Sequence, residues 1–238
     1  MIDPYIITVR DNKVSEKARF SCLESSKSVK NPFEINTFDA ITPDEINPFL
    51  LKFNVHWDYP FDRTSYCTKI NVYKTPYVTK NRDAKIACAL SHYALWLKSY
   101  QDSVPILILE HDAMFTRQLD DEWINRIMDS PYQFIGINDP IGATRKAKVF
   151  DSAIRNSKTK GVIDCPLVDD DYTTIQGLAG GSAYFIKPEG ATILLDLIDD
   201  LGLWHNDCII SHQVLSGLLG VTTTYFTKIQ PNVGSTTV

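Results

Sequence analysis

Two carboxylates follow a short apolar run, in the segment Glu110-His111-Asp112. The run at residues 106–109 is too short for a helix and β-branched at two of its four positions, so it predicts a central strand. Acidic residues at the carboxyl end of a buried strand lie at the sheet edge where α/β proteins bind ligands. Such oxygen ligands suit a Mg²⁺ or Mn²⁺ ion that also touches a diphosphate. The alternative is an ordinary polar turn.

The elements around this segment predict an α/β layer fold, because short apolar runs alternate with longer amphipathic stretches. The clearest helix is expected at residues 84–101, where apolar side chains recur at spacings of four, three and four residues. Further strands are expected at residues 5–9, 36–40, 132–137 and 182–186. Further helices are expected at residues 120–128 and 188–201, and from Asn206 or Asp207 to about residues 217–220. Residues 42–82, with four prolines, are expected to be irregular with short helices.

The composition is that of an ordinary soluble globular protein, with 44% hydrophobic and 22% charged residues. A net charge of −5 argues against a general nucleic-acid coat, and no apolar run approaches the ~20 residues that a membrane helix needs. The N-terminus has no pattern of a secretory signal, so a cytoplasmic location is expected, or the host cytoplasm for a viral protein. The five cysteines form no Cys-x-x-Cys pair and are interpreted as buried thiols.

Basic residues concentrate in one stretch, residues 142–160, which holds six Lys or Arg against Asp151 alone. This local charge of +5, expected on a loop, contrasts with the acidic remainder of the chain. An anionic partner such as DNA could dock there. The alternatives are a solvated loop, or a loop that closes over a bound diphosphate.

Two motifs stand about a dozen residues apart: IACALSHYALW at residues 86–96 and PILILEHDA at residues 105–113. Together they resemble glycosyltransferase family 25, whose members show a Gly-Cys-x-x-Ser-His helix and then an apolar strand ending in Glu-Asp-Asp. Further similarities to the same family lie, in order, at residues 5–10 with Arg19, 37–40, 180–186, 204–207 and 230–233, and those outside residues 176–190 are weaker.

The resemblance implies an A-type glycosyltransferase fold, with a single Rossmann-like mixed sheet flanked by helices. It also implies one domain over residues 1–238, with a nucleotide-sugar-binding part at 1–115 and an acceptor-binding part at 116–238. The expected reaction is a metal-dependent, inverting transfer of a hexose from a nucleotide sugar, expected to be a UDP-sugar, to a hydroxyl acceptor. The default acceptor is a saccharide. A phage-encoded member that glycosylates hydroxymethylated DNA bases is the first alternative.

The resemblance also implies roles for individual residues. Asp207 is the expected general base, and the competing interpretation makes it only the cap of a helix. Asp112 is expected to bind Mn²⁺ or Mg²⁺. The nucleotide-sugar site is expected to draw on Arg10, Arg19, Ser91, His92, Glu110, Gly180 and Gly181.

Each of these donor-site residues also has a plainer interpretation. The arginines could be solvated on the surface, Ser91 and His92 could serve only the fold, and the two glycines could form a simple turn. Two later histidines, His205 and His212, are candidate metal or phosphate ligands, or structural residues.

Two positions depart from the family pattern. Ala87 replaces the glycine before the cysteine, which is a small change. His111 replaces the central acid, and an imidazole ligand would favour Mn²⁺ over Mg²⁺ if it points at the metal. The same replacement motivates a second alternative, a catalytically inactive relative that only binds a sugar or nucleotide.

Overall fold

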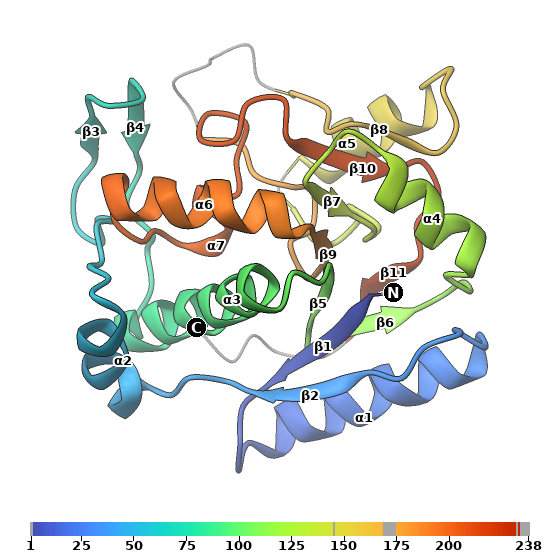
Figure 1. Cartoon of the computed structure of the whole chain (residues 1–238), viewed down its shortest axis with the longest axis horizontal. Helices are drawn as coiled ribbons and strands as arrows, with labels where there is room; N and C mark the ends of the chain where they lie inside the picture. The colour runs from blue at the N-terminus through green and yellow to red at the C-terminus, as the bar shows by residue number, and fades with distance from the viewer. Residues whose placement is uncertain (1, 145, 169–174, 232, 234–238) are drawn as a thin grey trace.

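A sheet of seven strands, in the order β2-β1-β5-β9-β7-β10-β8, runs through the computed structural model, which describes residues 2–144, 146–168, 175–231 and 233 (Figure 1). Its strands are β1 (Asp3–Thr8), β2 (Asn36–Asp39), β5 (Ile106–Glu110), β7 (Phe134–Gly136), β8 (Val162–Asp164), β9 (Ala183–Ile186) and β10 (Leu219–Thr222). Two smaller antiparallel sheets pair β3 (Ser65–Cys67) with β4 (Val72–Lys74), and β6 (Ala113–Phe115) with β11 (Thr227–Ile229).

The directions of the strands determine where the site can lie. Strand β1 runs parallel to β2 and β5, whereas β9 runs antiparallel to its two neighbours, β5 and β7. The carboxyl ends of β1, β2, β5 and β7 therefore meet the start of β9 at one edge of the sheet. Ligands bind at such an edge in open α/β sheets.

Helices and the small β6–β11 sheet cover both faces of the large sheet (Figure 1). The helices are α1 (Lys13–Ser28), α2 (Ile46–Phe53), α3 (Arg82–Asp102), α4 (Asp121–Asp129), α5 (Ala147–Arg155), α6 (Pro188–Leu201) and α7 (Asn206–Ile209), with a short 3₁₀ turn η1 (Pro43–Glu45). One core packs beneath α2, α3 and α6, and the other packs against α1, α4 and the β6–β11 pair. The expected α/β fold with a mixed sheet flanked by helices is confirmed.

Residues 106–109 of strand β5 are apolar because both faces of the strand are buried. Ile106 and Ile108 enter the core beneath α3, and Leu107 and Leu109 enter the opposite core. All four side chains are at most 1% exposed. Burial of a side chain of this size stabilises a fold by about 1.5–3 kcal/mol. The strand is thus fixed from both faces up to the residue where the acidic segment begins.

Helix α3 carries the serine–histidine motif along β5. It begins after Asn81, whose side chain accepts a hydrogen bond from the backbone N–H of Ala84, and it ends at Ser103 in the left-handed conformation. Ser91 and His92 are completely buried in its middle. The structure confirms the helix that periodicity predicted at residues 84–101, with slightly wider bounds.

Other expectations need correction. Residues 147–155 of the basic stretch form helix α5 rather than a loop, because Phe150 and Ile154 are spaced four residues apart and buried. The helix expected from Asn206 to about residues 217–220 ends at Ile209, and β10 occupies the end of that range. Residues 42–82 contain α2 and the β3–β4 hairpin. Helix α1 was not predicted.

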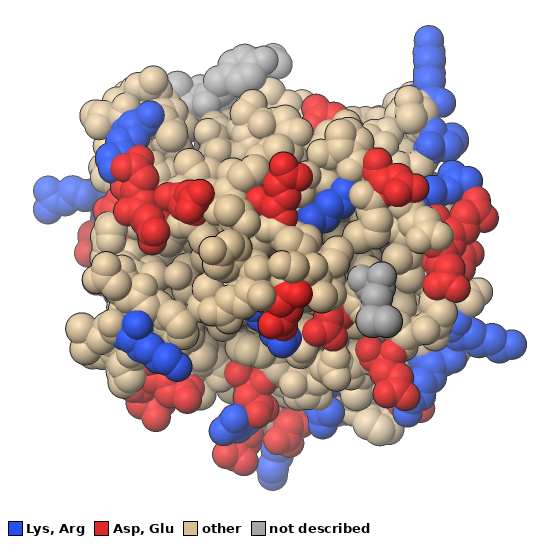
Figure 2. Space-filling model, in the orientation of Figure 1, with Lys and Arg blue, Asp and Glu red and all other residues tan. Residues whose placement is uncertain are grey.

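Charged side chains are spread over the molecule. On the face shown in Figure 2, Lys and Arg lie mainly around the rim and alternate with Asp and Glu. Within the basic stretch, the Arg155 Nε lies 2.7 Å from Asp151 Oδ1, and Arg145 lies outside the described residues. None of the helices in the described ranges is long and apolar enough to cross a membrane.

Candidate active site

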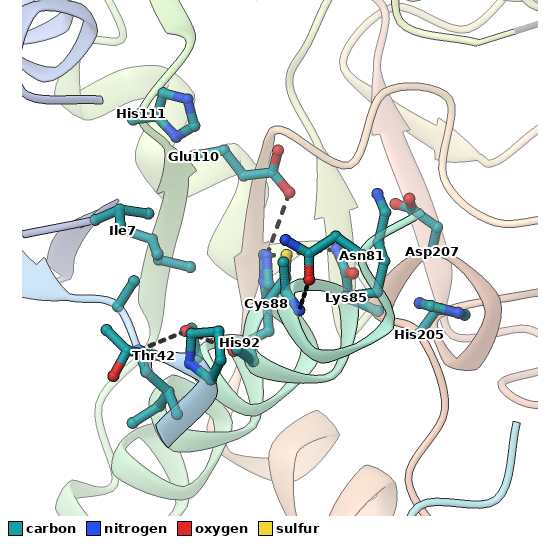
Figure 3. Close-up of a pocket in the computed structure, with 18 of the residues that line it drawn as sticks. Ile7, Thr42, Asn81, Lys85, Cys88, His92, Glu110, His111, His205 and Asp207 are labelled. Carbon is teal, nitrogen blue, oxygen red and sulfur yellow. Dashed lines mark hydrogen bonds and ion pairs between the residues drawn. The ribbon is translucent and has the colours of Figure 1, made fainter. Parts of the chain in front are cut away.

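A cavity of about 400 Å³ opens at the sheet edge where β1, β2 and β5 end. Figure 3 shows Ile7 and Thr42 at one end, Lys85, Asp207 and His205 at the other, and Glu110 between them. Its lining residues come from the ends of β1, β2 and β5, from the first half of α3, and from the start of α7. Segments far apart in the chain therefore supply one site. The sequence-predicted residues that line this cavity are Ser91, His92, Glu110, His111, Asp112, His205 and Asp207.

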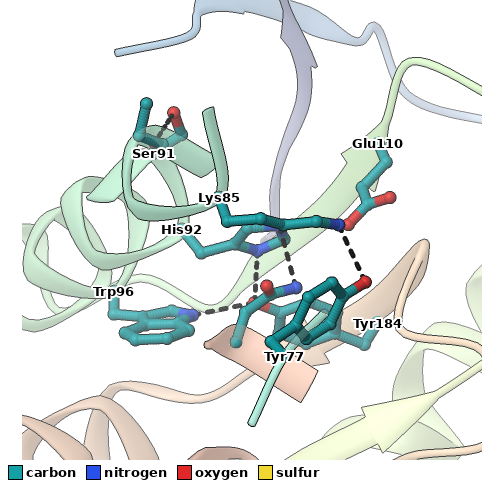
Figure 4. Close-up of polar contacts among 9 residues, drawn as sticks. Tyr77, Lys85, Ser91, His92, Trp96, Glu110 and Tyr184 are labelled. Carbon is teal, nitrogen blue, oxygen red and sulfur yellow. Dashed lines mark hydrogen bonds and ion pairs between the residues drawn. The ribbon is translucent and has the colours of Figure 1, made fainter. Parts of the chain in front are cut away.

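A buried chain of hydrogen bonds orients Glu110 (Figure 4). The indole Nε1–H of Trp96 donates to the Tyr184 hydroxyl at 2.8 Å, and that hydroxyl lies 2.9 Å from His92 Nδ1. His92 Nε2 lies 3.3 Å from Glu110 Oε1. An indole can only donate, so the Tyr184 oxygen is the acceptor for Trp96.

The direction of the remaining bonds follows from this first one. The Tyr184 hydroxyl hydrogen is free to donate to His92 Nδ1, which places the imidazole proton on Nε2. Nε2–H then donates to the Glu110 carboxylate. Burial would raise the pKa of Glu110, but the hydrogen bond from His92 holds it below its usual value. Glu110 is thereby kept ionised at the cavity wall.

The acidic segment turns into the cavity directly after β5. Asp112 Oδ1 and His111 Nε2 are buried atoms without a hydrogen-bond partner among the described residues. Burial, together with the charge of Glu110, raises the pKa of Asp112 to about 7, and burial lowers the pKa of His111. Two carboxylates whose charges act on each other in a desolvated site repel, and a cation between them relieves that repulsion.

Gln230 holds this turn in place from the C-terminal side. Its backbone N–H donates to Asp112 O at 2.8 Å, and its side-chain amide donates to Ala113 O at 3.0 Å and to His111 O at 3.3 Å. The same amide donates to Ala18 O of α1 at 2.8 Å. The backbone of the acidic turn is therefore fixed, and its side chains are left for a ligand.

The residues present fit a divalent cation. Asp112, with an orphaned carboxylate oxygen, lines the cavity with the carboxylate of Glu110 and the imidazole of His111, and these are donor types that Mn²⁺ and Mg²⁺ accept. The ligand atoms of these three residues do not all lie within 4.8 Å of one another in the described structure, so a bound cation would have to draw them together. Cys88 has its sulfur within 4.8 Å of ligand atoms of His92 and Glu110. Burial raises the pKa of the Cys88 thiol, and both nitrogens of His92 already have neighbours, so this trio is the weaker candidate.

Asp207 faces the same cavity from the first turn of α7. Two glycines make room for it. A Cβ atom at Gly181 would lie 2.6 Å from Asp207 Oδ1, and one at Gly177 would lie 2.3 Å from the Asp207 carbonyl oxygen. Desolvation by the surrounding protein, together with the charge of Glu110, raises the pKa of Asp207. A carboxylate of raised pKa that is open to a cavity is suited to accept a proton.

His205 lies in an aromatic surround next to Asp207. Rings of Trp57, Tyr59, Phe61 and Tyr77 lie 4.4–5.7 Å from its ring, measured between centroids. It is 2% exposed, and its Nε2 has no partner among the described residues. Burial, followed by the charge of Lys85, lowers the pKa of His205 to about 3. The imidazole is neutral at physiological pH.

Five sequence-predicted residues lie outside the cavity lining, and one of them is Gly181, described above beside Asp207. Arg10 pairs with Asp39 at 2.7 Å, and Arg19 donates a long hydrogen bond of 3.4 Å to Thr37. Gly180 has a φ of +87° and lies against Asn138. His212 lines a separate hollow with Leu167 and Gln213. Ser91, which does line the cavity, accepts from the Ile41 N–H and donates to Ala87 O, so it serves the fold.

Some residues of the site were not identified from the sequence: Tyr184, Trp96, Asn206, Gly177 and Lys85. The Asn206 amide lies 3.3 Å from His92 Nε2, although the two residues are 114 positions apart in the sequence. For the segment that contains Asn206, the sequence predicted only the start of a helix at Asn206 or Asp207, because an acidic or amide residue favours a helix start.

The comparison with known families identifies an enzyme that transfers a sugar, a glycosyltransferase. The chain belongs to glycosyltransferase family 25, described as a family of LPS biosynthesis proteins, whose model matches residues 5–210. No curated protein sequence matches the chain.

Solved structures resemble it at low similarity. The galactosyltransferase LgtC in complex with donor and acceptor sugar analogs has a TM-score of 0.42 and 10% identity, over 92% of this chain and 73% of that one. An active-site mutant of LgtC has a TM-score of 0.41 and 10% identity, over 92% of this chain and 72% of that one. Mouse xyloside xylosyltransferase 1 has a TM-score of 0.41 and 11% identity, over 88% and 80%.

Proposed function

We propose that the chain is an inverting hexosyltransferase that uses a UDP-sugar donor, Mn²⁺ or Mg²⁺, and a hydroxyl group of a saccharide as acceptor. The observation that carries the proposal is the unpartnered Asp112 carboxylate oxygen, which shares one cavity with Glu110 and Asp207. One end of this cavity is apolar enough for a nucleoside, through Ile7, Val9 and the residues after β2. The other end holds the candidate base.

The proposal gives each carboxylate of the cavity a separate role. Asp112, with His111, would hold the metal ion, which when bound offsets the negative charge of the leaving diphosphate. Glu110, kept ionised by its hydrogen bond from His92, accepts a hydrogen bond from a hydroxyl group of the nucleotide sugar. Asp207 accepts the proton of the acceptor hydroxyl as that oxygen attacks the anomeric carbon. A single displacement of this kind inverts the configuration at that carbon.

The acceptor is expected beside Asp207. This residue belongs to the part 116–238 proposed for the acceptor, and Gly181 and Gly177 form the wall behind it. The family description as LPS biosynthesis proteins supports a saccharide acceptor. For the DNA alternative, residues 147–155 of the basic stretch form a helix, and in it Arg155 is already paired with Asp151. The inactive-relative alternative depends on His111, whereas Asp112 and Asp207 are both retained in the cavity.

Titration of the protein with UDP-glucose and UDP-galactose, with and without Mn²⁺, tests the proposal. Wild type should bind a donor in a Mn²⁺-dependent manner and hydrolyse it slowly. Asp112→Asn should weaken Mn²⁺-dependent donor binding by at least about ten-fold, which is about 1.4 kcal/mol. Asp196→Asn, an exposed change of the same type on α6, is the matched control and should bind as wild type does. Equal donor affinity in Asp112→Asn and wild type would refute the metal site.

A further inference from the structure

One basic side chain of the cavity has no role in the proposal above. Lys85 lies in the first turns of α3, and it is the only Lys or Arg among the described residues that line the cavity. Its Nζ donates to the Tyr77 hydroxyl at 2.8 Å and lies 4.4 Å from the centre of that ring (Figure 4). Tyr77 packs in turn on His205. The ammonium group is therefore held at a defined place.

The ammonium of Lys85 lies within the electrostatic reach of the reactive groups. Its charge lowers the pKa of Glu110, of Asp207 and of His205, although in each case it is a smaller cause than burial. Within 4.0 Å it forms no ion pair with a carboxylate of the described residues. An ammonium has three N–H donors, and the Tyr77 hydroxyl takes one. Two donors remain for a ligand.

The position along the cavity indicates which ligand atoms meet Lys85. Figure 3 shows Ile7 and Thr42 at the far end, then Glu110, then Lys85 beside Asp207. A donor with its nucleoside at the apolar end passes its diphosphate by the acidic turn and brings the phosphate–sugar bond to Lys85. The N-terminal turns of α3 add a favourable dipole for an anion, and the unpartnered His205 Nε2 is a further polar atom there.

We propose that Lys85 binds an anionic oxygen of the donor, the β-phosphate oxygen that becomes the leaving group. This inference rests on the proposed function. In the reaction, the bond between the anomeric carbon and the β-phosphate oxygen breaks, and its electron pair stays on that oxygen. The acceptor oxygen forms the new bond to carbon and passes its proton to Asp207. The charge that develops on the phosphate is then met by the Lys85 ammonium.

Tyr77 acts through Lys85 and is a positioning residue. Its hydroxyl accepts from Nζ, and its ring stands between Lys85 and His205. Loss of the hydroxyl leaves the ammonium charge in the cavity but removes its tether. Tyr77→Phe should therefore lower kcat more than it raises KM, because the charge on the phosphate develops only in the transition state.

Binding of UMP and UDP in the presence of Mn²⁺, measured by calorimetry, tests the inference without turnover. Wild type should bind UDP more tightly than UMP. Lys85→Met should reduce this UDP-to-UMP affinity ratio by about ten-fold and leave UMP binding unchanged, since a charge-assisted hydrogen bond is lost. Lys80→Met removes the same charge from an exposed position just before α3, outside the cavity lining, and should keep the wild-type ratio. Lys85→Gln serves as the second variant if Lys85→Met is unstable.

A second arm distinguishes the source of the anionic oxygen. UDP-glucose and UDP-glucuronic acid differ by one carboxylate on the sugar. If Lys85→Met leaves UDP binding intact but removes a preference for UDP-glucuronic acid, Lys85 binds the sugar carboxylate and the β-phosphate assignment is wrong. Unchanged affinities of Lys85→Met for all four nucleotides would overturn any ligand role. A wild type that binds none of them would refute the proposed function itself.

Discussion

Gly181 controls where the candidate base can stand. A methyl group at this position would lie 2.6 Å from Asp207 Oδ1, which is 0.8 Å short of the 3.4 Å at which ordinary contact begins. The main chain at Gly181 is not in the left-handed region, so Gly181→Ala adds only this contact. Because the closest atom belongs to a side chain, the Asp207 carboxylate should rotate away while the fold persists.

The expected effect on catalysis is large for so small a change. A misplacement of about 1 Å at a reacting group lowers turnover by about a hundred-fold, or about 2.7 kcal/mol of transition-state stabilisation. We therefore expect kcat of Gly181→Ala to fall by one to two orders of magnitude, on the order of 10–100-fold, with the KM for the donor little changed. Asp207→Asn should lose at least as much.

The assay is steady-state sugar transfer to a saccharide acceptor, with donor hydrolysis as the fallback readout. Gly136→Ala is the matched control, because its Cβ would meet Val221 at an ordinary 3.5 Å and lies in strand β7, away from Asp207. Both variants should retain the wild-type melting temperature within a few degrees. A Gly181→Ala enzyme with wild-type kcat would show that the carboxylate of Asp207 is not the proton acceptor.

Two further predictions concern buried groups. Tyr184→Phe removes the partner of both Trp96 Nε1–H and His92 Nδ1, so it should destabilise the protein by about 1–3 kcal/mol. In ¹⁵N NMR the Nδ1 signal should shift as its hydrogen bond is lost, while the proton stays on Nε2, where Glu110 still accepts it; an unchanged Nδ1 signal would contradict the chain of bonds. His205 has a folded pKa of about 3 against 6.5 in the unfolded chain, so the unfolded state binds more protons between these values and stability falls as the pH falls through them. In chemical denaturation, the free energy of unfolding of wild type should change by about 1.4 kcal/mol per pH unit more than that of His205→Phe between these pH values. An equal pH dependence of the two free energies would refute the neutral buried imidazole.

The elements predicted correctly are those whose large apolar side chains follow a clear period. Strand β5 and helices α3 and α6 bury Leu, Ile and aromatic residues, so their hydrophobic patterns can be recognised from the sequence alone. Helix α1 was not predicted because the residues that it buries are small or polar: Ser15, Ala18, Cys22 and Ser26. A helix that packs with such residues leaves no hydrophobic stripe to read. In α5, basic residues on the exposed face obscured the Phe150–Ile154 pair.

The candidate site was partly visible for a related reason. Acidic residues directly after a buried strand must reach a sheet edge, so Glu110 and Asp112 could be placed from the sequence. The contact of His92 with Tyr184 joins residues 92 positions apart, and no local pattern encodes it. Lys85 looked like one more basic residue of a helix start. Its place in the cavity depends on how α3 packs against β5 and α7.

The amide of Gln230 has a consequence for the order of folding. It joins α1 and the acidic turn through a contact between residues 212 positions apart, to Ala18 O. Contacts of such separation close a long loop and form late, after local helices and neighbouring strands. The nucleoside end of the cavity, made by β1, β2 and α3, can thus assemble before the turn that carries Asp112 is fixed. During refolding, nucleoside binding should therefore recover before Mn²⁺-dependent binding does, and the proposed metal site should be the last part of the enzyme to mature.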